Sequence, residues 1–129
     1  MSTLHTIIIE FTDDPNMIDN HGLGTYKTLP NGNKIVKAYM KDENSYNEAF
    51  LISIHELVEQ RLTEIRGIKE EDIDAFDKKI DDQGGFADEA GNEPDSPYIR
   101  EHRFAENIER LVAHEMGINW QEYYNNYQV

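Results

Sequence analysis

The sequence of 129 residues contains no cysteine, and this absence limits both its covalent structure and its metal chemistry. Disulfide bonds and metal sites built from thiolates are excluded. The N-terminus lacks the basic and then apolar pattern of a secretion signal, and no apolar run approaches the length of a membrane span. We therefore expect a soluble, cytoplasmic protein without a membrane partner, folded as a single domain over residues 1–129.

Basic residues are also scarce. The chain has 12 Lys and Arg against 26 Asp and Glu, which gives a formal net charge of -14. An acidic surface repels the phosphates of nucleic acids, so we expect no direct nucleic-acid partner. The same charge attracts cations, although most of these carboxylates are expected to lie on a solvated surface.

The first 41 residues carry the signals of a small sheet. Residues 4–11 are rich in β-branched side chains that alternate between two faces, which is typical of a strand. Two further strands are expected at residues 26–29 and 34–40, because the Pro-Asn-Gly-Asn segment between them is a good hairpin signal. The pattern predicts an antiparallel sheet of about three strands.

Helical periodicity dominates residues 45–129. Ser45 and Glu48 form a capping-box pattern at the start of a long helix, and Gly67 is placed to end it. The core-facing stripe of this helix is expected to consist of the following apolar residues: Phe50, Leu51, Ile54, Leu57, Val58, Leu62 and Ile65.

Further helices are expected beyond the long one. A shorter helix at residues 70–82 is followed by a long loop at residues 83–96 that is rich in Gly, Pro and acids. A third main helix begins with Ser96 and Pro97 and runs to Met116, and a short aromatic helix completes the chain. The sequence therefore predicts an α+β fold, in which the small sheet precedes three main helices and a short C-terminal helix.

The residues with the clearest chemistry lie within the long helix. His55 and Glu59 are four residues apart, so both side chains project from one helix face and can hold a single ion. We expect this pair to be half buried, at the border of the apolar stripe. Glu56 points about 100° away and can act on the same ion through a water molecule, as a general base. A histidine together with a carboxylate suits Zn, Mn or Fe.

The third main helix offers a second set of histidine and carboxylates. Glu101 falls among apolar residues on the core-facing side, where a carboxylate is costly unless it is paired or bound to metal. His102 and Glu109 lie two turns apart along one flank of the same helix. The predicted metal ligands combine the two helices: His55, Glu59 and His102, with Glu101 or Glu109 as a fourth ligand or an outer partner.

An alternative interpretation needs no metal. Glu101 then forms an ordinary ion pair with Arg61, Arg66 or Arg100, and His102 is a residue at the border of the core.

Several short segments resemble a group of small, uncharacterised phage and prophage proteins. The resemblance covers about residues 50–124 and rests on the following segments: Ile-His-Glu-Leu-Val-Glu at 54–59, Gly-Ile at 67–68, Asp-Ala-Phe-Asp at 74–77, Glu-Pro at 93–94, Pro-Tyr at 97–98 and Glu-His at 101–102. It implies a phage or prophage context and no established activity.

The order of a sheet followed by a His-Glu helix also resembles a minimal zincin. In zincins, apolar residues precede His-Glu-x-x-His, and the glutamate of that motif is the general base. The resemblance implies a metal-dependent hydrolase in which Glu56 is catalytic and His102 supplies a ligand from a later helix. Glu59 stands where the zincin pattern has its second histidine.

Two other functions remain open. The first is a non-enzymatic phage accessory protein, in which a polar cluster only holds the helices together. The aromatic segment Trp120–Tyr127 would then bind a protein partner or a second copy of the chain, unless its side chains simply cover the open end of the core. The second is a Mg-dependent nucleotide pyrophosphatase, because Glu56-x-x-Glu59 and Glu71-x-x-Asp74 resemble the paired acidic helices of the all-α enzymes.

Overall fold

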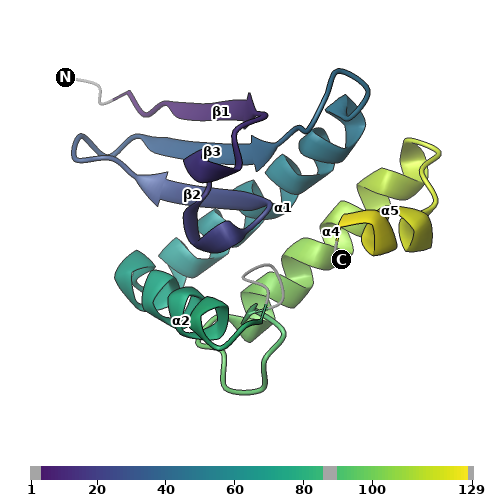
Figure 1. Ribbon diagram of the computed structural model, residues 1–129. Coiled ribbons are helices and arrows are strands. Elements are labelled where there is room, and N and C mark those ends of the chain that lie inside the picture. The colour runs from purple at the N-terminus through teal and green to yellow at the C-terminus, as the bar shows by residue number, and fades with distance from the viewer. Residues whose placement is uncertain (1–3, 86–89, 128–129) are drawn as a thin grey trace.

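The computed structural model describes residues 4–85 and 90–127, so residues 86–89 of the predicted loop 83–96 lie outside the described residues. The strands and helices follow in this order: β1 (Ile7–Thr12), β2 (Gly24–Thr28), β3 (Lys34–Tyr39), α1 (Tyr46–Ile65), α2 (Glu70–Asp82), α4 (Ile99–Glu115) and α5 (Trp120–Tyr127) (Figure 1). Two short 3-10 turns, Pro15–Met17 and Asp19–His21, separate β1 from β2. Within the described residues, a three-stranded sheet is followed by four helices, the last of them short, which confirms the predicted α+β class.

The sheet has the strand order β1-β3-β2 and is mixed. β2 and β3 form the predicted antiparallel hairpin, with Gly32 at a positive φ of 90° in the turn. β1 pairs with β3 in parallel, with Ile9 opposite Val36, so the prediction of a wholly antiparallel sheet is wrong. The alternation of apolar residues specifies the faces of a strand but not its neighbour or direction. The connection from β1 to β2 is long enough to leave room for β3 between them.

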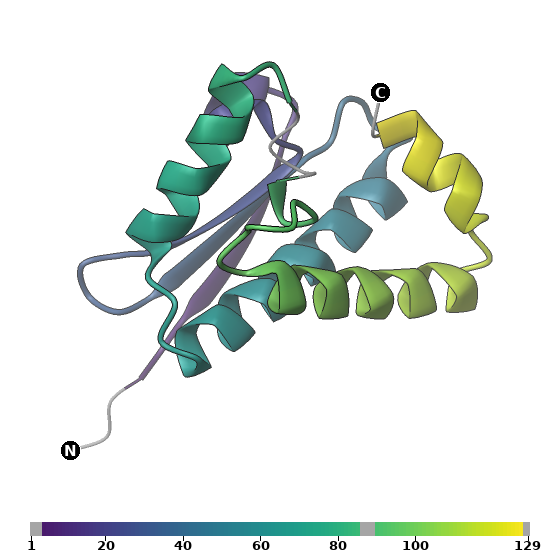
Figure 2. The same cartoon turned by 90° about the horizontal axis from the view of Figure 1, so that it is seen from below.

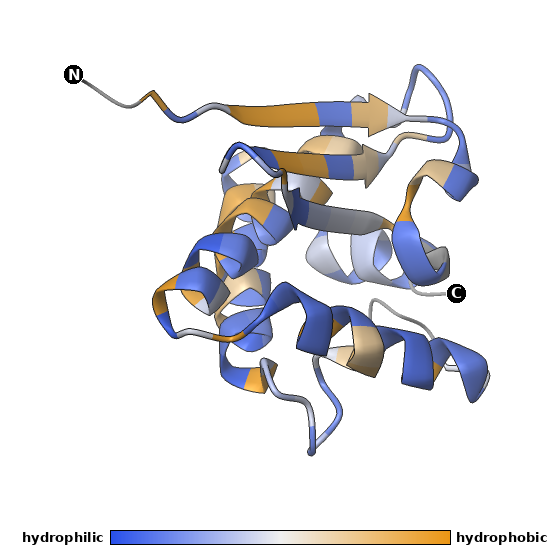
Figure 3. Cartoon of the chain, turned by 90° about the vertical axis from the view of Figure 1, so that its left-hand side faces the viewer, coloured by the Kyte–Doolittle hydropathy of each residue, from blue (hydrophilic) through white to orange (hydrophobic). Residues whose placement is uncertain are grey.

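The helix α1 is the central layer of the fold. It lies across one face of the sheet, and α4 packs against α1 on the side away from the sheet (Figures 1 and 2). Val36 and Ala38 of β3 are fully buried on the face that α1 covers. At the free edge of the sheet, Ile7 and Ile9 of β1 remain 52% and 45% exposed. Figure 3 shows this apolar strand along the edge.

The central position of α1 changes which of its residues are buried. Phe50 and Ile65 belong to the predicted core-facing stripe but are 37% and 61% exposed. The buried residues of α1 instead include a polar set: Ser53, His55, Glu59, Gln60 and Thr63. The stripe prediction is therefore wrong for Phe50 and Ile65, because α4 covers a helix face that the sequence marks as polar.

The structure confirms the predicted C-terminal end of α1 and corrects the predicted capping at its N-terminal end. Gly67 follows the helix with a φ of 71°, a conformation that favours glycine, and the N–H of Ile68 bonds to the carbonyl of Thr63 at 2.9 Å. The capping box does not form at the start. The Ser45 hydroxyl donates to Asp42 at 2.9 Å instead of accepting a bond from the helix.

The C-terminal elements close the other end of the core. α2 has the predicted bounds, whereas α4 begins at Ile99, later than the predicted start at Ser96. In α5, Tyr123 is buried against Leu51 of α1 and Ala113 of α4. Over the described residues, every helix is too short or too polar to serve as a membrane span.

Candidate metal centre

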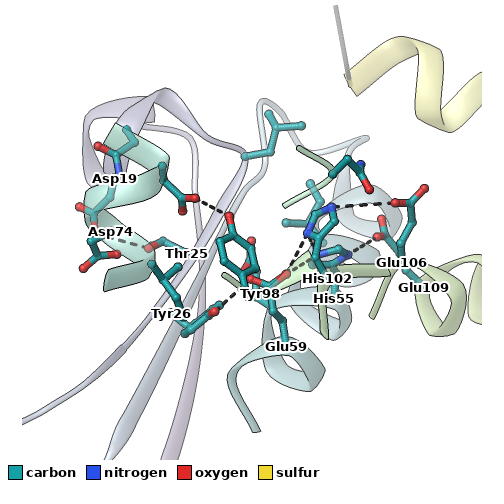
Figure 4. Close-up of a pocket in the computed structure, with 18 of the residues that line it drawn as sticks. Asp19, Thr25, Tyr26, His55, Glu59, Asp74, Tyr98, His102, Glu106 and Glu109 are labelled. Carbon is teal, nitrogen blue, oxygen red and sulfur yellow. Dashed lines mark hydrogen bonds and ion pairs between the residues drawn. The ribbon is translucent and has the colours of Figure 1, made fainter. Parts of the chain in front are cut away.

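Three side chains from two helices meet at one point between α1 and α4. His55 and Glu59 lie on adjacent turns of α1, and His102 lies near the start of α4 (Figure 4). His55 Nε2 is 3.0 Å from Glu59 Oε2 and 3.2 Å from His102 Nδ1. His102 Nδ1 is 2.9 Å from the same Glu59 oxygen. The structure thus brings together the three predicted ligands in a group that could hold a metal ion.

This His-His-Glu group is buried more deeply than the sequence predicts. His55, Glu59 and His102 are 9%, 4% and 6% exposed, whereas the first two were expected to be half buried. The difference arises because α4 covers this face of α1. Ala105, a small residue three positions after His102 in α4, is also fully buried. Burial strengthens every polar contact in the group and makes an unpaired polar atom costly.

Each imidazole has a carboxylate on its far side. His55 Nδ1 is 2.9 Å from Glu109 Oε1, and His102 Nε2 is 3.9 Å from Glu106 Oε2. The other oxygen of Glu109 accepts a hydrogen bond from the Tyr123 hydroxyl of α5. Partners of this kind fix the orientation of a histidine and the tautomer that presents its free nitrogen. Glu109 thus contacts His55 from outside the group of three, and its role as an outer partner of a metal ligand stays a prediction.

Glu101 and Glu56 lie outside the group of three. Glu101 accepts a hydrogen bond from Arg66 Nη1 at 2.6 Å, which is one of the ion pairs that the alternative interpretation predicted. Glu56 lines the pocket beside the group and packs against β2, since a Cβ atom built on Gly24 would lie 2.7 Å from Glu56 Cγ. The role of Glu56 as a general base stays a prediction.

Sequence reasoning missed several residues that support the group. The Tyr26 hydroxyl of β2 donates to the second oxygen of Glu59 at 3.0 Å. Tyr26 and Tyr123 reach the site from elements far away in the sequence, so no spacing identifies them. Glu106 could have been found, because it stands four residues after His102 on the same helix face.

The three polar atoms of the His-His-Glu group meet at a single carboxylate oxygen. Glu59 is a carboxylate and only accepts, while each imidazole nitrogen either donates or accepts. With a proton on both His55 Nε2 and His102 Nδ1, both nitrogens donate to Glu59 Oε2, at 3.0 and 2.9 Å, and lie 3.2 Å from each other. If one of the nitrogens lacks its proton, its lone pair faces the carboxylate instead. The arrangement therefore gathers three atoms that can each bind a metal ion at one point of a buried site.

The charged side chains of the group stabilise one another. Burial lowers the pKa of His55, but Glu109 and Glu59 outweigh burial and hold that pKa well above 6.5. Burial raises the pKa of Glu59, but hydrogen bonds from His102 and His55 lower it from 4.5 to about 2. His55 is therefore a cation between two carboxylates at neutral pH. A metal ion that binds His55 Nε2 must displace a proton from it.

A cavity of about 80 Å³ opens beside the group and is large enough for several water molecules. Figure 4 shows the two histidines at one end of this pocket and Asp19 and Asp74 at the other. Its lining is rich in carboxylates: Asp19, Glu56, Glu59, Glu70, Asp74, Asp77, Glu106 and Glu109. No Lys or Arg is found among the described residues that line it.

Fold and site together define an α+β protein with a buried His-His-Glu group between two helices. Comparison of the chain with protein-family models, with curated proteins and with solved structures finds no match. Its function therefore has to be inferred from the site itself.

The pKa of Glu59 predicts how the stability of the metal-free protein depends on pH. Because its pKa is about 2 in the folded protein and 4.5 in the unfolded one, its contribution is complete above pH 4.5 and is lost as pH falls toward 2. Relative to Glu59→Gln, the wild type should lose about 2 kcal/mol of unfolding free energy between pH 6 and pH 3. Urea denaturation in the presence of a chelator measures this difference.

Glu64→Gln is the matched control on the same helix. Glu64 forms ion pairs with Lys34 and Arg61, but it is exposed, so its pairs are weakened by solvent. Lys34 and Arg61 lower the pKa of Glu64 too, but solvent weakens this effect, so we expect Glu64→Gln to change less with pH than Glu59→Gln. A pH dependence of Glu59→Gln no larger than that of Glu64→Gln would contradict the strongly lowered pKa of Glu59.

Gly91 is required for the position of His102. A Cβ atom built on Gly91 would lie 2.5 Å from His102 Nδ1, so Gly91→Ala must displace the imidazole. We expect this variant to shift the His102 Nδ1 resonance in nitrogen NMR spectra and to lower the unfolding free energy by about 1–3 kcal/mol. Gly117→Ala is the control, because its Cβ atom meets nothing within 4 Å and only the φ of 74° is unfavourable. It should lose stability and leave the resonance in place, whereas an unchanged resonance in Gly91→Ala would show that the packing is different.

Proposed function

We propose that the protein binds one divalent transition-metal ion through His55, Glu59 and His102. The observation that carries this proposal is the triangle of ligand atoms, with sides of 2.9, 3.0 and 3.2 Å. Neighbouring ligands of a tetrahedral ion with bonds near 2 Å lie about 3.3 Å apart, and those of an octahedral ion about 3.0 Å apart. The three ligand atoms therefore match one triangular face of either a tetrahedral or an octahedral coordination shell. An ion at this point would accept a lone pair from each of the three atoms.

The charge of the buried group also supports a divalent ion. The carboxylates of Glu59 and Glu109 carry two negative charges, and their side chains are only 6% and 9% exposed. A protonated His55 balances one of these charges, whereas a doubly charged ion with two neutral imidazoles balances both. An unbalanced charge in a buried site is costly. Two imidazoles and a carboxylate suit Zn, Mn or Fe.

An ion at this position would have room for a water molecule on the pocket side. Three protein ligands and one water are the usual arrangement of catalytic zinc sites. We infer a zincin-like hydrolysis in which the ion, when bound, would activate a water molecule for attack on a carbonyl carbon of the substrate. Glu56 would accept a proton from that water and return it to the leaving group as the scissile bond breaks. The presence of Glu56 in the lining of the same pocket supports this role. The phage or prophage context stays a prediction.

A second candidate is a non-enzymatic accessory protein, in which the polar group only holds α1 against α4. One observation favours it: the ring nitrogens of His55 and the oxygens of Glu59 and Glu109 all have hydrogen-bond neighbours within the protein. The nucleotide pyrophosphatase has no comparable support. Glu71, which that function requires, is exposed and is not among the described residues that line the pocket.

Zinc titration tests the proposal directly. Protein purified without an affinity tag and treated with a chelator should bind one zinc ion per chain and gain thermal stability. His102→Ala should lower the zinc affinity by more than about 100-fold, because even the outer partners of metal ligands contribute 10- to 100-fold. Isothermal titration calorimetry measures both values.

His114→Ala is the matched control for this titration. His114 is exposed near the end of α4 and should keep the wild-type affinity when replaced. If zinc, manganese and iron all fail to bind the wild type or to raise its melting temperature, the metal centre is refuted and the structural candidate is favoured.

The proposed role of Glu56 as a general base can be tested separately from metal binding. Glu56→Gln should keep the zinc affinity but lower zinc-dependent hydrolysis by at least about 100-fold, the usual contribution of a positioned base. Hydrolysis of 4-nitrophenyl acetate can serve as the assay, with exposed Glu64→Gln as the control. Full activity in Glu56→Gln would remove Glu56 from the reaction, and zinc binding without any hydrolysis would support the non-enzymatic candidate.

A further inference from the structure

The pocket has an end that the proposed metal centre does not use. Asp19, from the turn before β2, and Asp74, from α2, lie there, on the opposite side of Tyr98 from the two histidines (Figure 4). Glu70 stands one helical turn before Asp74 and lines the same pocket. Three carboxylates from two separate elements thus border one end of a cavity whose other end holds the histidines.

The negative charge at this end is only partly balanced. Lys27 lies 3.3 Å from Asp19, and its charge lowers the pKa of Asp74. Burial together with the charges of Asp19 and Glu70 outweighs Lys27 and raises the pKa of Asp74. The carboxylate of Glu70 accepts hydrogen bonds from the backbone N–H and the hydroxyl of Thr28, which are neutral donors, at 2.8 and 2.5 Å.

The middle of the pocket is lined by acceptors and aromatic faces, and the two tyrosine hydroxyls there donate to carboxylates. The Tyr98 hydroxyl donates to Asp77, and the Tyr26 hydroxyl donates to Glu59. Trp120 also lines the pocket. A ligand that enters therefore meets carboxylates and ring faces, both of which attract a cation, together with the neutral amides of Asn20 and Asn92. A phosphate or carboxylate group would be repelled over the same path.

We infer that this pocket binds a small organic cation, with a primary ammonium group held between Asp19 and Asp74. The rest of the ligand extends past Tyr98 toward the His-His-Glu group, and a cavity of about 80 Å³ restricts it to a slender chain. The ammonium group belongs either to a free aliphatic amine or to the amino terminus of a short peptide. That the ligand reaches a metal ion depends on the proposed function, whereas the preference for a cation depends only on the carboxylates.

A matched ligand series tests this inference. The probes are butylamine, butanol and butyrate, which share one chain length and differ in charge, and inorganic phosphate. Butylamine should bind at least about tenfold more tightly than the other three, in zinc-treated and in zinc-free protein alike, and its affinity should fall with added salt. Titration followed by NMR measures these weak affinities. Equal or tighter binding of butanol, butyrate or phosphate would overturn the inference.

Substitutions of Asp19 and Asp74 test where the ammonium group binds. The double variant Asp19→Asn and Asp74→Asn should lower the butylamine affinity by at least about tenfold and leave the zinc affinity within about twofold. Asp72→Asn is the control, because Asp72 lies on the same helix as Asp74 but is exposed and outside the described lining of the pocket. Equal losses in both variants would mean that overall charge, and not this site, attracts the amine, and would overturn the inference.

Two further comparisons are needed. One distinguishes a peptide terminus from a free amine as the ligand, and the other distinguishes failure of the amine site from failure of the metal centre. Tri-alanine should bind more tightly than 1,4-diaminobutane if the ligand is a peptide terminus, and less tightly if it is a free amine. N-acetylated tri-alanine should bind more weakly than tri-alanine in either case, and equal binding would count against the inference. Failure of zinc to bind, with the amine preference intact, would refute the metal centre alone.

Discussion

The contact among His55, Glu59 and His102 is the constraint on which the rest of the structure depends. Three polar atoms lie within about 3 Å of one another in a buried site, and the surrounding structure holds them there. Every layer contributes. A tyrosine from the sheet supports Glu59, a tyrosine from the last helix supports the partner of His55, and Gly91 leaves the space that the His102 ring occupies.

Stability alone does not explain such a group. Replacing a buried ionic cluster by apolar side chains of similar volume is often neutral or stabilising, while removing one member of it is strongly destabilising. α1 could have packed between the sheet and α4 with an apolar face, as its own Leu51 does at one point. The chain instead buries two imidazoles and two carboxylates where a pocket reaches them. This cost supports a chemical role for the group.

The fold class and the grouping of His55, Glu59 and His102 could be predicted because they depend largely on local patterns. The hairpin at 30–33, the glycine at 67 and the i,i+4 spacing of His55 and Glu59 all act within a few residues. The direction of β1 and the buried face of α1 could not be predicted, because they are decided by which elements pack together. For the same reason, His102 was predicted from its own helix, whereas Tyr26 and Tyr123 were found only in the structure.

The separation of the two histidines along the chain has a mechanical consequence. His55 and His102 are 47 residues apart, and the segment between them includes α2 and the loop that follows it. In a chain without cysteine, an ion held by both would act as a removable cross-link that closes this loop. By the entropy of loop closure, a covalent link of the same span would stabilise the folded state by about 4 kcal/mol. Metal supply would then set how tightly the helical half of the molecule is held together.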